Sequence, residues 1–539
     1  MFVACQKNEV KLQDPYAGGK ASLGIEFSTK APYPAVASAG ETVEINVKGL
    51  KKYEGKFKLY VNELEAEIVE LTTDLIRFKV PQDASTGGVW VTLSNGTANL
   101  DNQTYFGPAL QIAGKVSIEP SFAVVNGSDY PINDIFRVPS GSFLLGGAFL
   151  DYEKTKTESS LINRIVLVNA LGVLDNSLKF GLGANGVIYS INRITSGDQN
   201  GKILIGGAFS SFNSRRSNRI NINSITRLNV DGTLDTTFTD VVNLTPNDPT
   251  KNRDTIPAFN GGVNTTGNTR GPLVRRLFNF NNRVYAVGNF NRYAKTFYER
   301  STYDTKVYDY TSISQVVRME MDGSMDSTYR YDKSSKVALP SSNGSIVDAL
   351  QLADGSLVLV GDFTSFDNTN KNRIVKLKAE GTVDETFATG TGANGPISSI
   401  TYNAITNKIV VAGNFTSFNG QPLMGVALLN TDGTISSGFT FPSISGGVVT
   451  FAAQLNNGKI IVSGSFDHYR NILRQGFMVL ENNGTLASGY NNTGIFAGTV
   501  YDMLEVVSPN GYPAVFLVGN ISRFNNNIVH NIVKVEIQN

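Results

Sequence analysis

The stretch NKIVVAGNFTSF at residues 407–418 contains the pattern that decides the fold, an apolar segment ending in Gly-x-Phe with a second aromatic residue three positions after the Phe. Successive copies are spaced by 51 to 81 residues, which indicates an array of supersecondary units rather than one irregular fold. The seven copies begin at Gly147, Gly207, Gly288, Gly361, Gly413, Gly464 and Gly519, and the last of them, GNISRF, has Ile521 in place of the Phe.

Each repeat reads as about four short antiparallel strands, since its apolar segments are short, rich in Val, Ile and Phe, and separated by Asn-Gly or Asp-Gly turns. Four-stranded units in this number are typical of β-propeller blades. The last repeat stops at IVKVEIQN without a fourth strand, and VSIEPSF at 116–122 aligns with TVDETF at 382–387. The sequence therefore predicts an all-β fold with a seven-bladed β-propeller over 116–539, closed by strand 116–122, which completes the last blade.

The repeats resemble the delta-60 family of propeller repeats, whose copies carry a strand ending in Gly-x-Phe and a later strand ending near Asp-x-x-Phe. The resemblance covers most of the chain and implies the propeller fold, but propellers host many functions.

Residues 25–113 lack the repeat and alternate polar with apolar residues in ETVEINVKG, KFKLYVN, DLIRFKVP and GGVWVTLSNG, which predicts an N-terminal immunoglobulin-like β-sandwich. Residues 40–43, 76–81 and 86–91 resemble strands of an IPT/TIG domain, a resemblance that implies a spacer or docking module. The only tryptophan, Trp90, lies within an alternating strand. We interpret it as a packing residue of the core or the sheet rather than a sugar-stacking residue.

The single cysteine, Cys5, follows Phe2, Val3 and Ala4 and precedes a polar stretch to about Gly24. This arrangement resembles the lipobox of bacterial lipoproteins, although no charged or apolar region precedes it, and a buried structural cysteine is the alternative. Residues 6–9 partly match the tag that sends lipoproteins of Bacteroidetes-type bacteria to the outer leaflet. The resemblance implies lipidation of Cys5, a tether over 1–24, and an outer-membrane protein that faces the cell exterior and touches the membrane through its lipid anchor only.

Charge and catalytic motifs exclude several classes of function. Lys and Arg number 47 against 46 Asp and Glu, with no basic run, so a nucleic-acid partner is not expected. The two histidines, His468 and His530, fall in different repeats, so we expect no catalytic residues, metal or cofactor. GLGANG at 181–186 and GTGANG at 390–395 match a dinucleotide fingerprint, but both share one phase of the repeat and are interpreted as blade-to-blade turns.

Paired-carboxylate chemistry on a glycan stays open, because its two acids can come from different blades. One set of acids recurs at the same point of successive repeats, which favours a structural hydrogen bond over catalysis. These acids are Asp175, Asp235, Asp326 and Asp384.

Functional residues are expected where the repeats differ, in the insertions at 240–272 and 293–314. The second insertion alternates tyrosines with charged residues, a pattern that suits both sugars and protein hot spots. Its alternative is an additional hairpin that packs on itself. The candidate ligand-binding residues are Tyr298, Arg300, Tyr303, Tyr308 and Tyr310.

Three functions are consistent with these observations. The sequence favours a non-catalytic cell-surface lipoprotein that binds a polysaccharide or oligosaccharide beside an outer-membrane uptake system. A surface scaffold or adhesin that binds protein partners is the second reading, and a glycan-cleaving propeller enzyme is the third.

Overall fold

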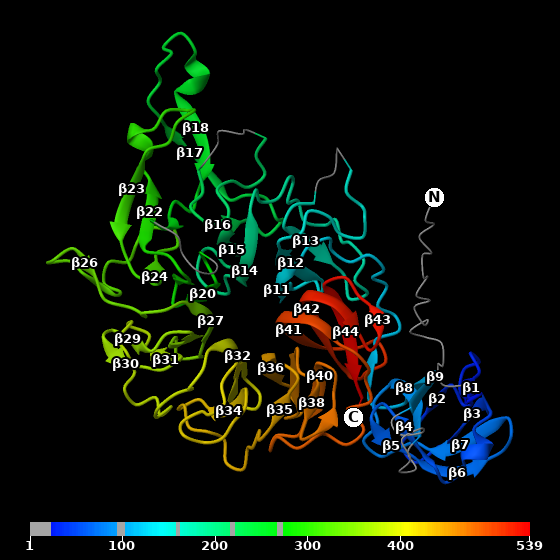
Figure 1. Cartoon of the computed structure of the whole chain (residues 1–539). Coiled ribbons are helices and arrows are strands. Elements are labelled where there is room, and N and C mark those ends of the chain that lie inside the picture. The colour runs from blue at the N-terminus through cyan, green and yellow to red at the C-terminus, as the bar shows by residue number, and fades with distance from the viewer. Residues whose placement is uncertain (1–22, 94–102, 158–161, 216–220, 267–272, 539) are drawn as a thin grey trace, which may run out of the picture. The chain divides into compact units, whose positions relative to one another are not determined.

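The computed structural model describes residues 23–93, 103–157, 162–215, 221–266 and 273–538. The chain divides into two compact units, residues 1–113 and 114–539, and each is described by itself. Both are built from β-strands, with single turns of 3-10 helix such as η1 (Lys51–Tyr53) between them (Figure 1). Cys5, the predicted lipidation site, lies outside the described residues.

The first unit is a sandwich of two sheets. One sheet has the order β1 (Glu26–Phe27), β3 (Thr42–Lys48), β7 (Leu75–Lys79) and β6 (Glu67–Leu71). The other has the order β2 (Val36–Ala37), β9 (Gln103–Ile112), β8 (Gly87–Leu93), β4 (Phe57–Val61) and β5 (Leu64–Glu65). Alternate residues of both sheets meet in one apolar core, as the alternation in the sequence predicts.

Trp90 lies on the outer face of the second sheet, because its neighbours Val89 and Val91 fill the core. Its ring stacks on Tyr60 of β4 at 5.8 Å and contacts Phe106 of β9 at 6.4 Å between ring centroids. Phe106 is 74% exposed. Trp90 is therefore a sheet-packing residue on the solvent side of the sandwich and not a core residue.

The second unit is a closed ring of seven blades. Blade one consists of β11 (Ile132–Arg137), β12 (Phe143–Gly147) and β13 (Ile165–Val168). Blade two consists of β14 (Val187–Arg193), β15 (Ile203–Ala208) and β16 (Ile225–Leu228). Blade three consists of β20 (Arg276–Phe280), β21 (Arg283–Val287) and β24 (Val316–Met319). Blade four consists of β27 (Ile346–Gln351), β28 (Leu357–Gly361) and β31 (Ile374–Leu377). Blade five consists of β32 (Ile397–Asn403), β33 (Lys408–Gly413) and β34 (Val426–Asn430). Blade six consists of β36 (Val449–Gln454), β37 (Ile460–Gly464) and β40 (Phe477–Leu480).

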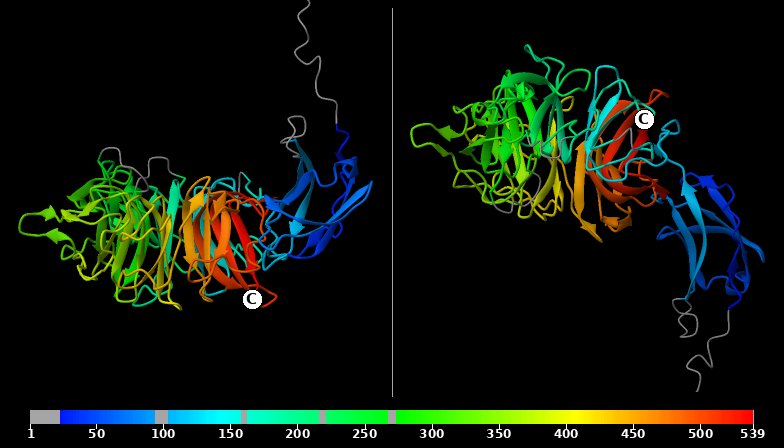
Figure 2. Two further views of the ribbon diagram at one scale, coloured as in Figure 1. Left: turned by 60° about the horizontal axis from the view of Figure 1, so that its bottom comes forward. Right: turned by 90° about the horizontal axis from the view of Figure 1, so that it is seen from above.

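The seventh blade closes the ring. It has the order β41 (Ala497–Val507), β42 (Pro513–Phe524), β44 (Ile532–Ile537) and β10 (Val116–Ile118). The predicted closing strand thus pairs antiparallel with the last strand of the chain, over three residues. The first strand of each blade contacts the first strands of both neighbouring blades, and in side view the blades form a flat disc (Figure 2).

In blades one to six the fourth strand is shorter than the sequence pattern predicts. It is reduced to one bridge in each blade, for example Leu377 with Val383 and Leu429 with Ile435. Two-residue strands lie in the connections: β25 (Tyr331–Asp332), β26 (Val337–Ala338), β29 (Ser365–Phe366), β30 (Thr369–Asn370), β35 (Ile444–Ser445), β38 (His468–Tyr469), β39 (Ile472–Leu473) and β43 (Asn527–Ile528).

The second aromatic residue of the repeat is buried in every blade, which explains its recurrence. Where it is tyrosine, its hydroxyl also donates to a carbonyl of the recurring glycine turn. Tyr152 donates to Gly172 at 2.8 Å, Tyr293 to Gly323 at 2.8 Å and Tyr469 to Gly484 at 2.5 Å. In these three blades the second aromatic residue and the turn glycine of the sequence pattern therefore contact each other.

A polar residue in the innermost strand fastens most blades to the next one. We call this the inter-blade position; from blade one to blade seven it is Asp134, Ser190, Arg276, Asp348, Ser399, Phe451 and Asp502. Four of these side chains accept the backbone N–H of a residue in the following blade: Asp134 from Ile191 (2.6 Å), Ser190 from Leu277 (3.0 Å), Asp348 from Ile400 (3.2 Å) and Asp502 from Ile135 (3.1 Å). The last of these bonds joins blade seven to blade one.

Ring closure gives the first testable prediction. Val116 of β10 is fully buried, whereas Ser117 beside it is partly exposed. Val116→Asp places a carboxylate in the core of the last blade, so we expect it to lower the free energy of unfolding by about 3 kcal/mol or more. Ser117→Asp is the matched control and should cost about 0.5 kcal/mol. Chemical denaturation measures both, and equal effects would contradict a closing role for β10.

The inter-blade position gives a prediction about pH. Burial, and next the charge of Asp502, raises the pKa of Asp134 well above its usual value. The folded state then holds this proton more tightly than the unfolded state, so the stabilisation is complete below about pH 3.9 and is lost as the pH rises through the folded pKa. We expect Asp134→Asn, which mimics the protonated form, to raise Tm at pH 8, with a difference that shrinks toward pH 4.

A carboxyl whose pKa is shifted in the opposite direction is the control for that experiment. Hydrogen bonds from Ser177, and next from Ser142, lower the pKa of Asp175, so its stabilisation is present at neutral pH and is lost as the pH falls. Asp175→Asn should therefore lower Tm at pH 8. A lower Tm for both variants at pH 8 would show that Asp134 is stabilising when ionised and would contradict the prediction.

Candidate functional site

The two insertions fold together as one substructure. Within them, β17 (Thr236–Asp240) pairs with β18 (Arg253–Pro257), and β22 (Arg292–Thr296) lies between β19 (Gly262–Asn264) and β23 (Tyr308–Ser312). Single helical turns η2 (Pro249–Lys251) and η3 (Tyr298–Arg300) cap the two hairpins. We call residues 236–257 and 292–312 the insertion module; it projects from the ring beside blades two and three (Figure 1).

Hydrogen bonds and ion pairs join the two hairpins of the insertion module. The backbone N–H of Val242 donates to the carbonyl of Ser301 at 2.8 Å. The ammonium of Lys306 lies 2.8 Å from the carboxylate of Asp254, and both side chains are almost fully buried. A second pair, Lys251 with Asp304 at 3.2 Å, is exposed. The Tyr-rich insertion is thus an additional hairpin, but it packs on the first insertion as well as on itself.

The predicted ligand-binding residues occupy different environments in this module. Tyr298 is only 6% exposed, with the Lys306 ammonium 6.0 Å from its ring centroid. Arg300 is exposed and lies over the ring of Phe297 at 4.9 Å. Tyr303 is partly buried, and its carbonyl accepts a hydrogen bond from Lys306 at 3.1 Å. These three residues build the tip of the hairpin.

Tyr308 and Tyr310 are brought together on one face of β23. Their ring centroids are 6.0 Å apart with planes inclined by 33°, and Tyr310 is 43% exposed. The guanidinium of Arg292, on the adjacent strand β22, lies 5.3 Å from the Tyr310 centroid. Burial raises the pKa of Tyr308 to about 12, so its hydroxyl stays protonated at neutral pH. We call Arg292, Tyr308 and Tyr310 the aromatic platform.

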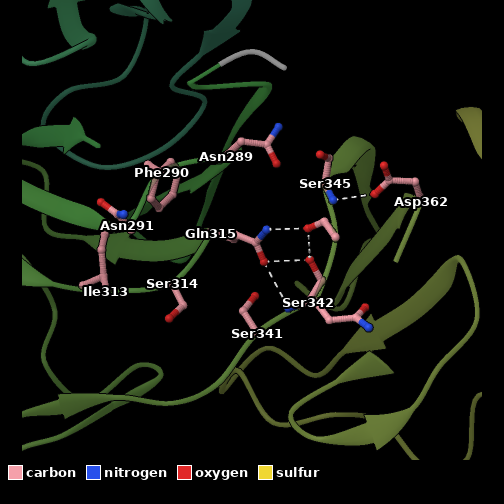
Figure 3. A pocket seen from close by; sticks show the side chains of 12 residues that line it. Asn289, Phe290, Asn291, Ile313, Ser314, Gln315, Ser341, Ser342, Ser345 and Asp362 are labelled. Atoms are coloured by element: carbon pink, nitrogen blue, oxygen red, sulfur yellow. Dashed lines mark hydrogen bonds between the residues drawn. The ribbon is translucent and has the colours of Figure 1, made fainter. Parts of the chain in front are cut away.

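A groove of about 560 Å³ begins where the platform hairpin joins the ring (Figure 3). Asn291, next to Arg292, lines it, and so do Ile313 and Ser314, which follow β23. Blade four supplies the opposite wall from residues 341–345 and Asp362. The groove therefore lies between blades three and four, at the base of the hairpin that carries the aromatic platform.

Most polar groups of the groove are held in place. The Gln315 amide accepts hydrogen bonds from the N–H (3.0 Å) and hydroxyl (2.8 Å) of Ser342 and donates to the carbonyl of Gly344 (2.8 Å) (Figure 3). Asp362 accepts from the N–H of Ser345 at 2.5 Å. Within the described part of the chain, the buried hydroxyl of Ser341 has no hydrogen-bond partner. A ligand or water in the groove can satisfy it.

The groove leads to the mouth of the central channel. A second cavity, of about 300 Å³, is lined by the first residues of the innermost strands, among them Arg275, Ser398 and Tyr501. Asn289 and Ser345 line both cavities. The groove and the channel mouth thus share part of their lining.

The acidic residues that recur in the repeat have structural partners. The recurring acids make local contacts, as when Asp235 binds Arg227 at 2.6 Å and Asp384 accepts from Thr386 at 2.6 Å. Over the described ranges, no group of three or more His, Cys, Asp or Glu side chains could hold a metal ion.

Three parts of this site were not predicted from the sequence. Arg292 belongs to the GNFNRY motif, where it reads as a repeat residue, and only its cross-strand position beside Tyr310 gives it a role. Gln315 and Ser342 are ordinary polar residues in the sequence. The tyrosine-rich composition was the available signal, and it located the hairpin but not the groove.

Comparison with protein families supports the two-part architecture. Residues 3–108 match a domain of unknown function called DUF5008. Residues 199–238, 352–387 and 406–439 match DUF5122, a β-propeller domain of unknown function. The fold therefore defines the class of this protein as an all-β protein with a β-propeller. No curated protein matches the sequence.

Solved structures from Bacteroides species are among those to which this chain is similar. The extracellular domain of a one-component system from B. thetaiotaomicron is 10% identical over 78% of this chain, with a TM-score of 0.35. A structure of unknown function from Bacteroides thetaiotaomicron (11% identity, 95% of this chain and 98% of that one, TM-score 0.22) and an auxiliary nutrient binding protein from Bacteroides ovatus (10% identity, 72% and 95%, TM-score 0.21) are also similar. This chain spans only 39% of the first of these proteins.

The two ion pairs of the insertion module give a matched test of its packing. Lys306→Met leaves the buried carboxylate of Asp254 without its cation, which we expect to destabilise the module locally by about 3 kcal/mol. Lys251→Met removes an exposed pair and should cost at most about 1 kcal/mol. Limited proteolysis should show faster cleavage within 236–257 and 292–312 for Lys306→Met only. Equal cleavage of both variants would mean that the buried pair does not hold the hairpins together.

Proposed function

We propose that this protein is a non-catalytic, cell-surface lipoprotein that binds an oligosaccharide or polysaccharide along the path from the aromatic platform to the channel mouth. The observation that carries the proposal is the polar groove at the base of the hairpin that also carries the exposed Tyr310 ring. Aromatic faces pack on the apolar faces of sugar rings, and fixed amides and hydroxyls orient the sugar hydroxyls. Capture beside an outer-membrane uptake system, with Cys5 as the lipid anchor, is part of this proposal.

The lining of the groove supports a sugar more than an apolar ligand. Asn291, Gln315 and the serines at 341, 342 and 345 offer hydrogen-bonding groups, and Phe290 and Ile313 are the apolar residues between them. A ligand with several hydroxyl groups and small apolar patches matches this alternation. Since Gln315 and Asp362 are already hydrogen-bonded, the groove is preorganised, which reduces the entropy lost on binding.

A protein partner is the second candidate, because the insertion module also exposes apolar side chains. Phe238 is 67% exposed and Leu244 is 77% exposed. Exposed large apolar groups on a projecting hairpin are typical of protein-binding surfaces. Under this reading the protein is a surface scaffold or adhesin.

A binding screen with matched variants tests the proposal. The full chain, without lipid, is screened against a glycan array and by affinity electrophoresis in polysaccharide gels, and the same samples are assayed for new reducing ends. We expect retention without release of reducing ends. Tyr310→Ala should weaken retention at least tenfold, since it removes the exposed stacking face.

Asp309→Ala is the control, because Asp309 precedes Tyr310 on the same strand and points to the opposite face. Equal glycan retention of the two variants would show that the aromatic platform does not take part in glycan binding. Release of reducing ends would replace the binding function with an enzymatic one. No retention by any glycan, together with a partner whose binding is lost in Phe238→Ser, would establish the protein-binding alternative.

A further inference from the structure

The mouth of the central channel holds one charged residue in a ring of otherwise uncharged ones. Each innermost strand contributes the residue just before its inter-blade position: Asn133, Tyr189, Arg275, Val347, Ser398, Thr450 and Tyr501. Five of these seven residues, including Arg275, line the cavity of about 300 Å³. The ring therefore carries a single positive charge at the end of the groove.

Arg275 makes few of the contacts that a buried guanidinium needs. Its side chain is 13% exposed, and its Nε is buried without a hydrogen-bond partner. In the part of the chain that the structure describes, none of its guanidinium nitrogens donates a hydrogen bond. Buried polar groups in proteins are nearly always paired, so an arginine with unused donors at a cavity is typical of a ligand site.

The nearby carboxylates do not satisfy Arg275. Asp348 lies 3.8 Å away, but its oxygens already accept hydrogen bonds from Arg276 at 2.8 Å and from the N–H groups of Ala349 and Ile400. Asp502 accepts from the N–H groups of Ile135 and Met503. Burial, and next the charge of Asp502, raises the pKa of Asp134, which favours its neutral form. Burial also lowers the pKa of Arg275, as expected for a cation that its surroundings compensate poorly.

The rest of the cavity is suited to a small anion with an apolar body. The hydroxyl of Ser399 lines it and is buried without a partner among the described residues. The Ser398 hydroxyl donates a hydrogen bond to the carbonyl of Thr450 at 2.9 Å, so it stabilises the wall of the cavity instead of donating to a ligand. Ile346, Val347 and Val500 supply apolar surface, and a site poor in water strengthens an ion pair with Arg275.

We propose that the channel mouth is a carboxylate subsite, in which Arg275 and Ser399 bind the carboxylate of an acidic sugar whose neighbouring residues occupy the groove. The choice of a sugar rests on the function proposed above, whereas the choice of an anion rests on Arg275 alone. The planar guanidinium matches a carboxylate in a two-bond geometry that a neutral sugar cannot offer. The protein would then select uronate-containing glycans over neutral ones.

The test uses the full chain with four probes: glucuronate, glucose, acetate and sulfate, each titrated by calorimetry. We expect glucuronate to bind at least tenfold more tightly than glucose. Arg275→Gln should weaken glucuronate binding at least tenfold, and Arg275→Lys should retain part of it because it keeps the charge. Glucuronate binding no tighter than glucose binding, or unchanged in Arg275→Gln, would overturn the subsite.

The stability of the unliganded variants shows whether a loss of binding is a loss of fold. Arg275→Gln removes a buried cation with unused donors, so its Tm should equal or exceed that of the wild type. Arg276→Gln removes the ion pair to Asp348 and should lower Tm. A fall in Tm for Arg275→Gln equal to that for Arg276→Gln would assign Arg275 a structural role and overturn the proposal.

The four probes also separate this inference from the proposed function. Acetate binding that is lost in Arg275→Gln, combined with no retention by any glycan, supports the anion subsite and refutes the sugar ligand. Tight binding of neutral glycans with no response to glucuronate or acetate refutes the subsite and supports the general function. Stronger binding of sulfate than of acetate and glucuronate would replace the carboxylate with a tetrahedral anion and overturn the assignment.

Discussion

Asp348 joins three consecutive blades through a single carboxylate. It accepts hydrogen bonds from Arg276 of blade three and from the N–H of Ile400 in blade five, while its own backbone belongs to blade four. The side chain is 3% exposed, so the cost of burying its charge is offset only if all of these partners stay in place. The equivalent residues Asp134, Ser190 and Asp502 make the same bond to the next blade. The blades are thus held at fixed angles by short polar contacts close to the ring axis, and the rest of the propeller depends on these contacts.

These inter-blade contacts explain why the residue before the inter-blade position can bind a ligand. The inter-blade residue and the residue before it are neighbours in sequence, yet one holds the adjacent blade while the other reaches the channel. Blade three places arginine at both positions. Arg276 hydrogen-bonds to Asp348 at 2.8 Å, whereas Arg275 lies 3.8 Å from the same carboxylate. The Nε of Arg275 has no hydrogen-bond partner among the described residues, which leaves this donor available for binding. Sites built on rigid strands in this way keep their geometry better than sites built on loops.

The insertion module shows how a repeat protein acquires a specific surface without disturbing its ring. Its two hairpins come from segments separated by β19, β20 and β21, and they are joined by the buried pair of Lys306 and Asp254. The tyrosines of the second insertion have two different roles in the structure. Tyr298 supports the hairpin from within, while Tyr310 faces solvent beside the groove. Composition alone does not separate these roles, since both residues have the same side chain and belong to the same hairpin.

The sequence by itself determined the ring, the number of blades and its closure by a strand predicted over 116–122, of which the structure forms 116–118, because each blade repeats the same apolar spacing and turn chemistry within local reach. It also predicted that the recurring acids are structural, and their contacts with Arg227 and Thr386 agree with this reading. Only the tertiary structure decided that Trp90 faces outward, that Gln315 and Ser342 shape a groove, and that Arg276 hydrogen-bonds to Asp348 while Arg275 only lies near it. These properties depend on which residues meet across strands and across blades. That pairing is set by the register and angle of neighbouring sheets, which a linear pattern does not specify.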